Sequence, residues 1–97
     1  MRFRDLRFEP HPRWAGVRAR VTFPNGYGAS VIRARGRYGG GSYGVEQGLY
    51  ELAVLGRDGY PCCDTPVRDG VLGYLSEAQV ETALAQIEAL DSAPVRR

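Results

Sequence analysis

Residues 17–35 read VRARVTFPNGYGASVIRAR, and this stretch decides the fold. Apolar and polar side chains alternate over residues 17–23, which is typical of a strand with one buried face. Asn25 and Gly26 follow, and Asn-Gly is the dipeptide that most strongly indicates a tight hairpin turn. The stretch therefore predicts two antiparallel strands joined by a two-residue turn.

A two-residue turn would also fix the register of this hairpin. It pairs position 21 with 30, 19 with 32 and 17 with 34, so that the apolar residues of both strands share one face. The opposite face then gathers four arginines: Arg18, Arg20, Arg33 and Arg35. Like charges placed opposite one another are unfavourable. The cluster is therefore either solvated and paired with Glu46 and Glu51, or a binding face for an acidic or phosphorylated partner.

The rest of the chain completes an α+β pattern. Residues 49–55 predict a strand that is apolar on both faces apart from Glu51, so it should lie centrally or be covered on both sides. Residues 71–75 form a further short apolar segment. Ser76 and Gln79 form a capping-box pattern at the start of a helix over 76–91, whose apolar stripe runs from Val80 to Leu90. We expect a single α+β domain over residues 1–97. Its sheet is a small antiparallel meander of three or more strands over 17–75, and its C-terminal helix, over 76–91, packs on one face of that sheet. Residues 1–16 form an N-terminal arm packed on the sheet edge, and residues 92–97 form a tail.

The connection over residues 36–48 is rich in glycine, which does not stabilise a helix or strand interior. It lacks the lysine and the following helix of a phosphate-binding P-loop. The segment interleaves arginines with tyrosines, a pattern that suits stacking on nucleic-acid bases: Arg35, Arg37, Tyr38 and Tyr43. A structural hairpin loop and a mobile loop that contacts a partner are the alternatives. We expect residues 36–47 to serve contact more than stability. If the loop is only a contact element, replacing 37–43 with a short glycine–serine turn should change stability by about 1 kcal/mol or less, whereas a loss of several kcal/mol would mean that Tyr38 and Tyr43 belong to the core.

The charge, the cysteines and the apolar content of the chain bear on its partners and its compartment. The chain has 97 residues and a net charge of +2, too small to indicate nucleic-acid binding by itself. All 13 basic residues are arginine, which is typical of a GC-rich genome. The two cysteines, Cys62 and Cys63, are adjacent and have no third cysteine to pair with, which predicts a reducing compartment. Neither a signal peptide nor a membrane span is evident, so we expect a cytoplasmic protein without a membrane partner.

Catalytic chemistry finds little support in the sequence. His11 is the only histidine, and a metal site would need it to converge with Cys62, Cys63 and Asp64. A cysteine nucleophile would need the same histidine as its base. Carboxylates that would form an acid–base pair do not stand out. We therefore expect no enzyme activity, no metal site and no cofactor.

Three segments carry a resemblance to a known family. They are FPNGYGASVIR at 23–33, SYGVEQGLYELAVL at 42–55 and DTPVRDGVLGYL at 64–75, followed by the acidic amphipathic helix. Together they resemble a family of small proteins encoded by bacteriophages and prophages, and the resemblance covers most of the chain. It implies a phage accessory protein that acts in the bacterial host cytoplasm, but it implies no activity and no binding residues.

The leading hypothesis is a non-enzymatic phage-encoded accessory protein that binds a host or phage protein and inhibits a host activity or defence system. One alternative is binding of nucleic acid, or of a nucleotide or other small phosphorylated ligand, through the arginine face and the glycine–tyrosine loop. The other is a minor virion component. The candidate binding residues are Arg18, Arg20, Arg33, Arg35, Arg37, Tyr38 and Tyr43.

Overall fold

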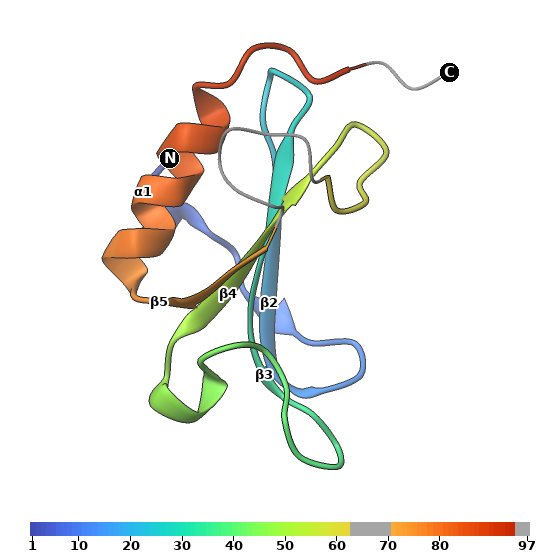
Figure 1. The fold of residues 1–97 in the computed structure, drawn as a ribbon, viewed down its shortest axis with the longest axis vertical. Coiled ribbons are helices and arrows are strands. Elements are labelled where there is room, and N and C mark those ends of the chain that lie inside the picture. Colours follow the sequence, from blue (N-terminus) through green and yellow to red (C-terminus); the bar gives the residue numbers. More distant parts are fainter. Residues whose placement is uncertain (63–70, 95–97) are drawn as a thin grey trace.

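The structure is a computed structural model that describes residues 1–62 and 71–94. Its elements are η1 (Phe3–Asp5), β1 (Glu9–Pro10), β2 (Ala15–Thr22), β3 (Gly28–Arg35), η2 (Val45–Gln47), β4 (Tyr50–Leu55), β5 (Val71–Leu75) and α1 (Glu77–Glu88). The strands form one five-stranded antiparallel sheet in sequential order, with α1 packed on one face (Figure 1). The predicted α+β fold, a meander with a C-terminal helix, is confirmed. Cys63, Asp64 and the end of the predicted tail lie outside the described residues.

The β2–β3 hairpin forms where the sequence predicts it, but the predicted register is wrong by one residue. The Phe23 N–H donates to the Tyr27 carbonyl at 2.7 Å, so the loop contains three residues, 24–26. Gly26, at φ 92°, closes the turn in the positive region, as is usual in three-residue hairpin loops. Pro24 explains this choice, because its fixed φ suits the first central position of an ordinary turn. The predicted two-residue turn would instead need a positive φ at Asn25, whose φ is negative.

The corrected register decides which residues enter the core. Ala19 pairs with Val31 and Val21 with Ala29, and these residues face α1. Ile32, expected in the core, lies on the opposite face, where it is half-buried. β4 lies between β3 and β5, as its apolar sequence predicts. The largest fully buried side chains are Val31, Leu52, Val54, Val80, Leu84 and Ile87.

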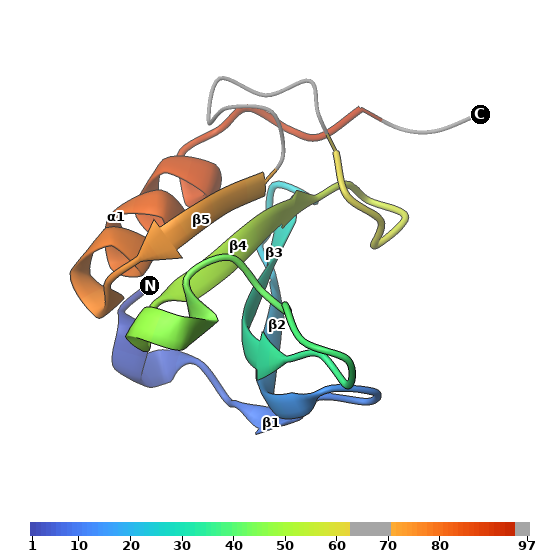
Figure 2. The same ribbon diagram turned by 60° about the horizontal axis from the view of Figure 1, so that its bottom comes forward.

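Helix α1 begins and packs as its sequence predicts. The Ser76 hydroxyl accepts the Gln79 N–H at 3.2 Å, and the Gln79 side chain accepts the Ser76 N–H at 2.9 Å. This reciprocal capping box satisfies two N–H groups that the first turn would leave unpaired. The buried residues of the helix, Val80, Ala83, Leu84 and Ile87, belong to the predicted apolar stripe. Leu90, its last predicted member, lies beyond the end of α1 and packs half-buried against the core. Figure 2 shows β4 and β5 running beside α1, while β2 and β3 twist away from it.

The hairpin loop also holds the end of the helix, which the sequence did not predict. The Asn25 side-chain amide donates to the carbonyl oxygens of Ile87 at 2.9 Å, Leu90 at 3.0 Å and Glu88 at 3.3 Å. Its own carbonyl oxygen, Oδ1, accepts the Tyr27 N–H at 3.0 Å. One side chain therefore satisfies the last carbonyls of α1 and orders its own turn.

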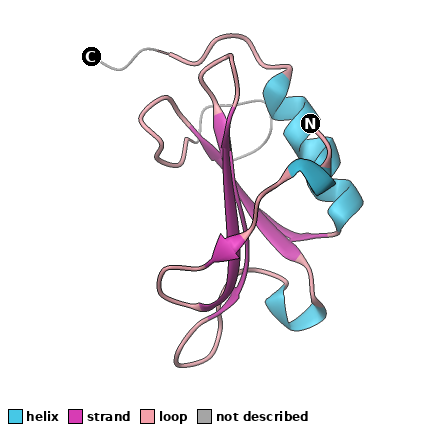
Figure 3. Ribbon diagram, turned by 180° about the vertical axis from the view of Figure 1, so that it is seen from behind, coloured by secondary structure: helices cyan, strands magenta, loops and turns pink. Residues whose placement is uncertain are grey.

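The N-terminal segment packs on both the core and the sheet edge. η1 lies on the same side of the sheet as α1 (Figure 3), and Phe3 and Phe8 place their rings 5.2 and 5.7 Å from that of Tyr50. β1 then pairs with the outer edge of β2, with Glu9 opposite Arg18. The segment leaves residues 11–14 as a loop on the far side of the sheet from the helix.

The glycine-rich connection between β3 and β4 is more ordered than the predicted loop. Its first part is a small hairpin in which the Gly36 N–H donates to Gly40 at 3.0 Å and Arg35 bridges to Gly41. Ser42, only 3% exposed, accepts the Ala34 N–H through its hydroxyl at 3.0 Å. A Cβ at Gly41 would lie 2.4 Å from the Ala34 carbonyl oxygen, so the close approach requires glycine there.

Candidate functional site

The four arginines expected on one face lie on two. Arg18 is opposite Ile32 and Arg20 opposite Ser30, on the face away from α1. Arg33 and Arg35 are opposite Val17 and Ala15, on the helix side. The predicted cluster is therefore wrong, because a register shift of one residue reverses the face of every side chain on one strand relative to its partner.

The two helix-side arginines already have partners. The Arg33 guanidinium lies 5.0 Å from the centroid of the Tyr50 ring, a cation–π arrangement at the edge of the core. Arg35 Nη2 lies 3.4 Å from Glu46 Oε2, and both side chains are well exposed. An exposed pair of this kind adds little stability. For Arg33 and Arg35, these contacts agree with the alternative in which the arginines are solvated and paired within the protein and do not form a binding face.

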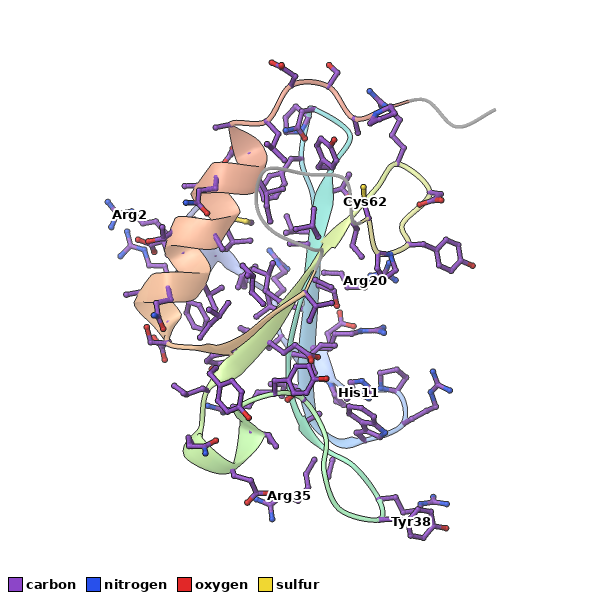
Figure 4. All side chains as sticks on the ribbon, viewed as in Figure 1. Arg2, His11, Arg20, Arg35, Tyr38 and Cys62 are labelled. Atoms are coloured by element: carbon purple, nitrogen blue, oxygen red, sulfur yellow. The ribbon has the colours of Figure 1, made fainter. Side chains whose placement is uncertain are left out.

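The helix-free face of the sheet has a mixed polar and apolar centre. Arg18, Ile32 and Glu51 form one row across β2, β3 and β4, and Arg20, Ser30, Ala53 and Val71 form the next. Arg20 Nη2 donates to the Gly59 carbonyl at 2.7 Å, which ties the loop after β4 to β2. Figure 4 shows Arg20 and His11 on the side of the sheet away from α1.

Glu51 is the acidic group at the centre of this face, and Glu9, opposite Arg18, lies at its β1 edge. Partial burial raises the pKa of the Glu51 carboxyl, and a hydrogen bond from the Tyr43 backbone N–H lowers it by a smaller amount. The carboxylate therefore makes the centre of the face less favourable for a polyanion than two arginines alone would suggest.

Tyr43 forms one border of this face, where the glycine-rich connection crosses β5. A Cβ at Gly73 would lie 2.6 Å from Tyr43 Cβ, so the ring's position depends on this glycine. The ring stacks with that of Tyr74 at 6.5 Å between centroids, and the two side chains are 58% and 57% exposed. Tyr74 has φ 57°, which is uncommon for a residue with a side chain and often marks functional sites.

His11 and Trp14 form the opposite border. His11 Nδ1 accepts the backbone N–H groups of Arg13 at 3.1 Å and Trp14 at 2.9 Å, and its ring stacks on the indole at 5.2 Å. Desolvation lowers the pKa of His11, and the charges of Arg18 and Arg13 lower it further. The imidazole therefore orders this loop in its neutral form.

The loop at 11–14 meets the tip of the glycine-rich hairpin. Between them lies a groove of about 540 Å³, lined by Pro12, Arg13, Trp14, Gly36, Arg37, Tyr38 and Gly39. Tyr38 is 93% exposed, and Figure 4 places it at the far end of the molecule, with Arg35 also at that end. Arg37 and Tyr38 were predicted site residues. Arg13 and Trp14 were not predicted. The sequence HPRW, in which an arginine and a tryptophan follow a proline in a turn, could have indicated an exposed contact loop.

The described residues contain no group of three histidine, cysteine or acidic side chains arranged to hold a metal ion. Over residues 1–62 and 71–94, helices with the length and apolar character needed to cross a membrane are not found. Comparisons of the chain with protein-family models, with curated proteins and with solved structures gave no match.

Proposed function

We propose that this chain is a non-enzymatic binding module that docks a protein partner on the helix-free face of its sheet. One observation carries the proposal. Among the described residues, the exposed large hydrophobic side chains other than Met1 come from this face or from the loops that border it: Trp14, Tyr38, Tyr43, Tyr60, Val71 and Tyr74. Aromatic residues and arginine are the types enriched where protein partners bind most strongly.

The chemistry of the face favours a protein over a polyanion. Ile32, Ala53 and Val71 supply apolar surface at its centre, while Glu51 would repel phosphate groups there. Arg18 and Arg20 add cationic groups on the β2 side of this centre, which suits a partner that carries acidic residues around an apolar patch. In the phage context that the sequence resemblance implies, this partner is a host or phage protein.

The test compares two variants that each add one arginine to an exposed position. Val71→Arg places the charge on the proposed surface, and Ala85→Arg places it on the outer side of α1, where the side chain is also exposed. We expect the wild-type protein and Ala85→Arg to capture the same stoichiometric partner from host lysate, and Val71→Arg to lose it. Equal capture by both variants, or no stoichiometric partner with the wild-type protein, would overturn the proposal.

A salt series separates this interaction from binding of nucleic acid. Binding driven by phosphate contacts weakens steeply as salt rises, whereas a largely apolar protein interface does not. Capture that survives both nuclease treatment and raised salt supports a protein partner.

A further inference from the structure

The groove between the 11–14 loop and the glycine-rich hairpin is chemically distinct from the centre of the helix-free face. Its lining includes two guanidinium groups and two aromatic rings, and no carboxylate. Its volume, about 540 Å³, lies in the range of roughly 300–1,000 Å³ that small-molecule sites occupy. We propose that this groove binds a phosphorylated nucleoside, either as a free nucleotide or as one unit of a single strand.

Among residues 1–62 and 71–94, no ion pair neutralises the charge of the groove. The described ion pairs join the N-terminus to Glu88 and Arg35 to Glu46, and neither involves Arg13 or Arg37. Both of these arginines are exposed at the groove. Guanidinium groups bind phosphate through two parallel hydrogen bonds, so an anionic phosphate complements this pair.

The aromatic rings supply the second part of the ligand's chemistry. His11 covers one face of the Trp14 indole, yet Trp14 remains 39% exposed and lines the groove. Tyr38, almost fully exposed, lines it from the other loop. Exposed indole and phenol rings bind nucleobases by stacking. A purely acidic ligand would leave both rings without a partner, and a base-paired duplex would hide its bases from them.

Both walls of the groove are held in place before any ligand binds. The histidine ring orders the 11–14 loop through two backbone hydrogen bonds. Across the groove, the Gly39 N–H donates to the Gly36 carbonyl at 3.4 Å, and Gly36 donates to Gly40 at 3.0 Å. A Cβ at Gly36 would lie 2.8 Å from the Gly39 carbonyl oxygen, so the tight turn depends on glycine. Ordered loops lower the entropy cost of binding.

Trp14 is the only tryptophan of the chain, so tryptophan fluorescence, excited at a wavelength where the six tyrosines absorb little, reports on this groove. The probes are adenosine monophosphate, adenosine, inorganic phosphate, a short oligothymidylate, the matching duplex and an acidic tyrosine-containing peptide. We expect adenosine monophosphate and the single strand to quench the fluorescence at low salt, and adenosine and phosphate alone to bind far more weakly. Equal affinity per molecule for the two ligands identifies a free nucleotide, and much tighter binding of the strand identifies single-stranded nucleic acid.

Variants test the assigned residues. Two phosphate-binding arginines predict a slope of log affinity against log salt of about −1.4 for a single strand, and Arg13→Ala or Arg37→Ala should each reduce it by about 0.7. Arg4→Ala removes the same charge from an exposed position in η1, on the helix side, and should leave the slope unchanged. Tyr38→Ala should weaken binding roughly 5- to 150-fold, the loss of one stacked base.

Three results would overturn the assignment. They are the absence of quenching by both phosphorylated probes at low salt, equal or tighter binding of the acidic peptide or the duplex, and an Arg4→Ala loss as large as that of Arg13→Ala. Val71 does not line this groove, so Val71→Arg should keep nucleotide binding even where it loses the protein partner.

Discussion

Replacing Asn25 with aspartate tests how the hairpin loop and the helix stabilise each other. Asn25→Asp keeps the side-chain oxygen that accepts the Tyr27 N–H, and aspartate is as acceptable in turns as asparagine. The change removes only the amide donor, which contacts the carbonyl oxygens of Ile87, Leu90 and Glu88. A carboxylate would face these same oxygens at the negative end of the helix dipole.

The magnitude follows from these contacts. The two shorter bonds, at 2.9 and 3.0 Å, contribute about 0.5–1.5 kcal/mol each. A negative charge at the C-terminal end of a helix costs about 0.3–1 kcal/mol more. We therefore expect Asn25→Asp to lower the free energy of unfolding by about 1.3–4 kcal/mol. In a domain of this size that lowers the melting temperature by roughly 5–30 °C.

Urea denaturation across a pH series is the appropriate assay. The carbonyl oxygens raise the pKa of the introduced carboxyl in the folded state above its unfolded value of about 3.9. The deficit relative to the wild-type protein should therefore be full at neutral pH and should shrink as pH falls below the raised pKa, because a protonated carboxyl can donate again.

A matched control makes the same chemical change without the contacts. Gln86→Glu replaces an exposed amide near the end of α1 by a carboxylate and should cost only the dipole contribution, about 0.3–1 kcal/mol. The reasoning is refuted if Asn25→Asp is no less stable than Gln86→Glu at neutral pH. A deficit that stays constant with pH would also contradict it.

Three further substitutions probe other contacts, each measured by urea denaturation. Ser42→Ala leaves the buried Ala34 N–H without its side-chain acceptor and should lower the free energy of unfolding by about 1–3 kcal/mol. As a control, Ser30→Ala removes a buried hydroxyl that accepts no N–H among the described residues and should cost clearly less. Equal losses in the two variants would contradict this. Burial raises the pKa of the Glu51 carboxyl in the folded state. The stability of the wild-type protein relative to Glu51→Gln should therefore fall as pH rises through the titration of this carboxyl. The opposite trend would show that burial does not dominate its pKa. Gly16→Ala places a Cβ 2.2 Å from a backbone carbonyl oxygen at φ 149° and should cost about 2 kcal/mol or more, so a variant of wild-type stability would show that the hairpin adjusts freely.

The sequence by itself determined the features that depend on local chemistry. Ser76 and Gln79 lie within one turn of each other, so the capping box and the start of α1 follow from their spacing alone. The alternation of residues 17–23 and the apolar run of 49–55 likewise determined strands β2 and β4, and the glycines determined where β3 ends. The α+β meander follows from these elements and their short connections.

Tertiary structure decided the features that depend on one residue of register or on contacts between distant segments. Pro24 extends the hairpin loop to three residues, and that single residue moves Arg33 and Arg35 to the opposite face from Arg18 and Arg20. Asn25 is a turn residue by sequence, but 62 positions along the chain its amide meets Ile87 at the end of the helix.

The groove is a product of tertiary structure in the same sense. Trp14 and Tyr38 belong to separate loops, and only the pairing of β1 with β2 and of β2 with β3 brings those loops to one end of the sheet. Periodicity reports the face a side chain takes within its own strand. Which side chains share that face across strands depends on turn geometry and packing, whose energies differ by only a few kcal/mol between neighbouring registers.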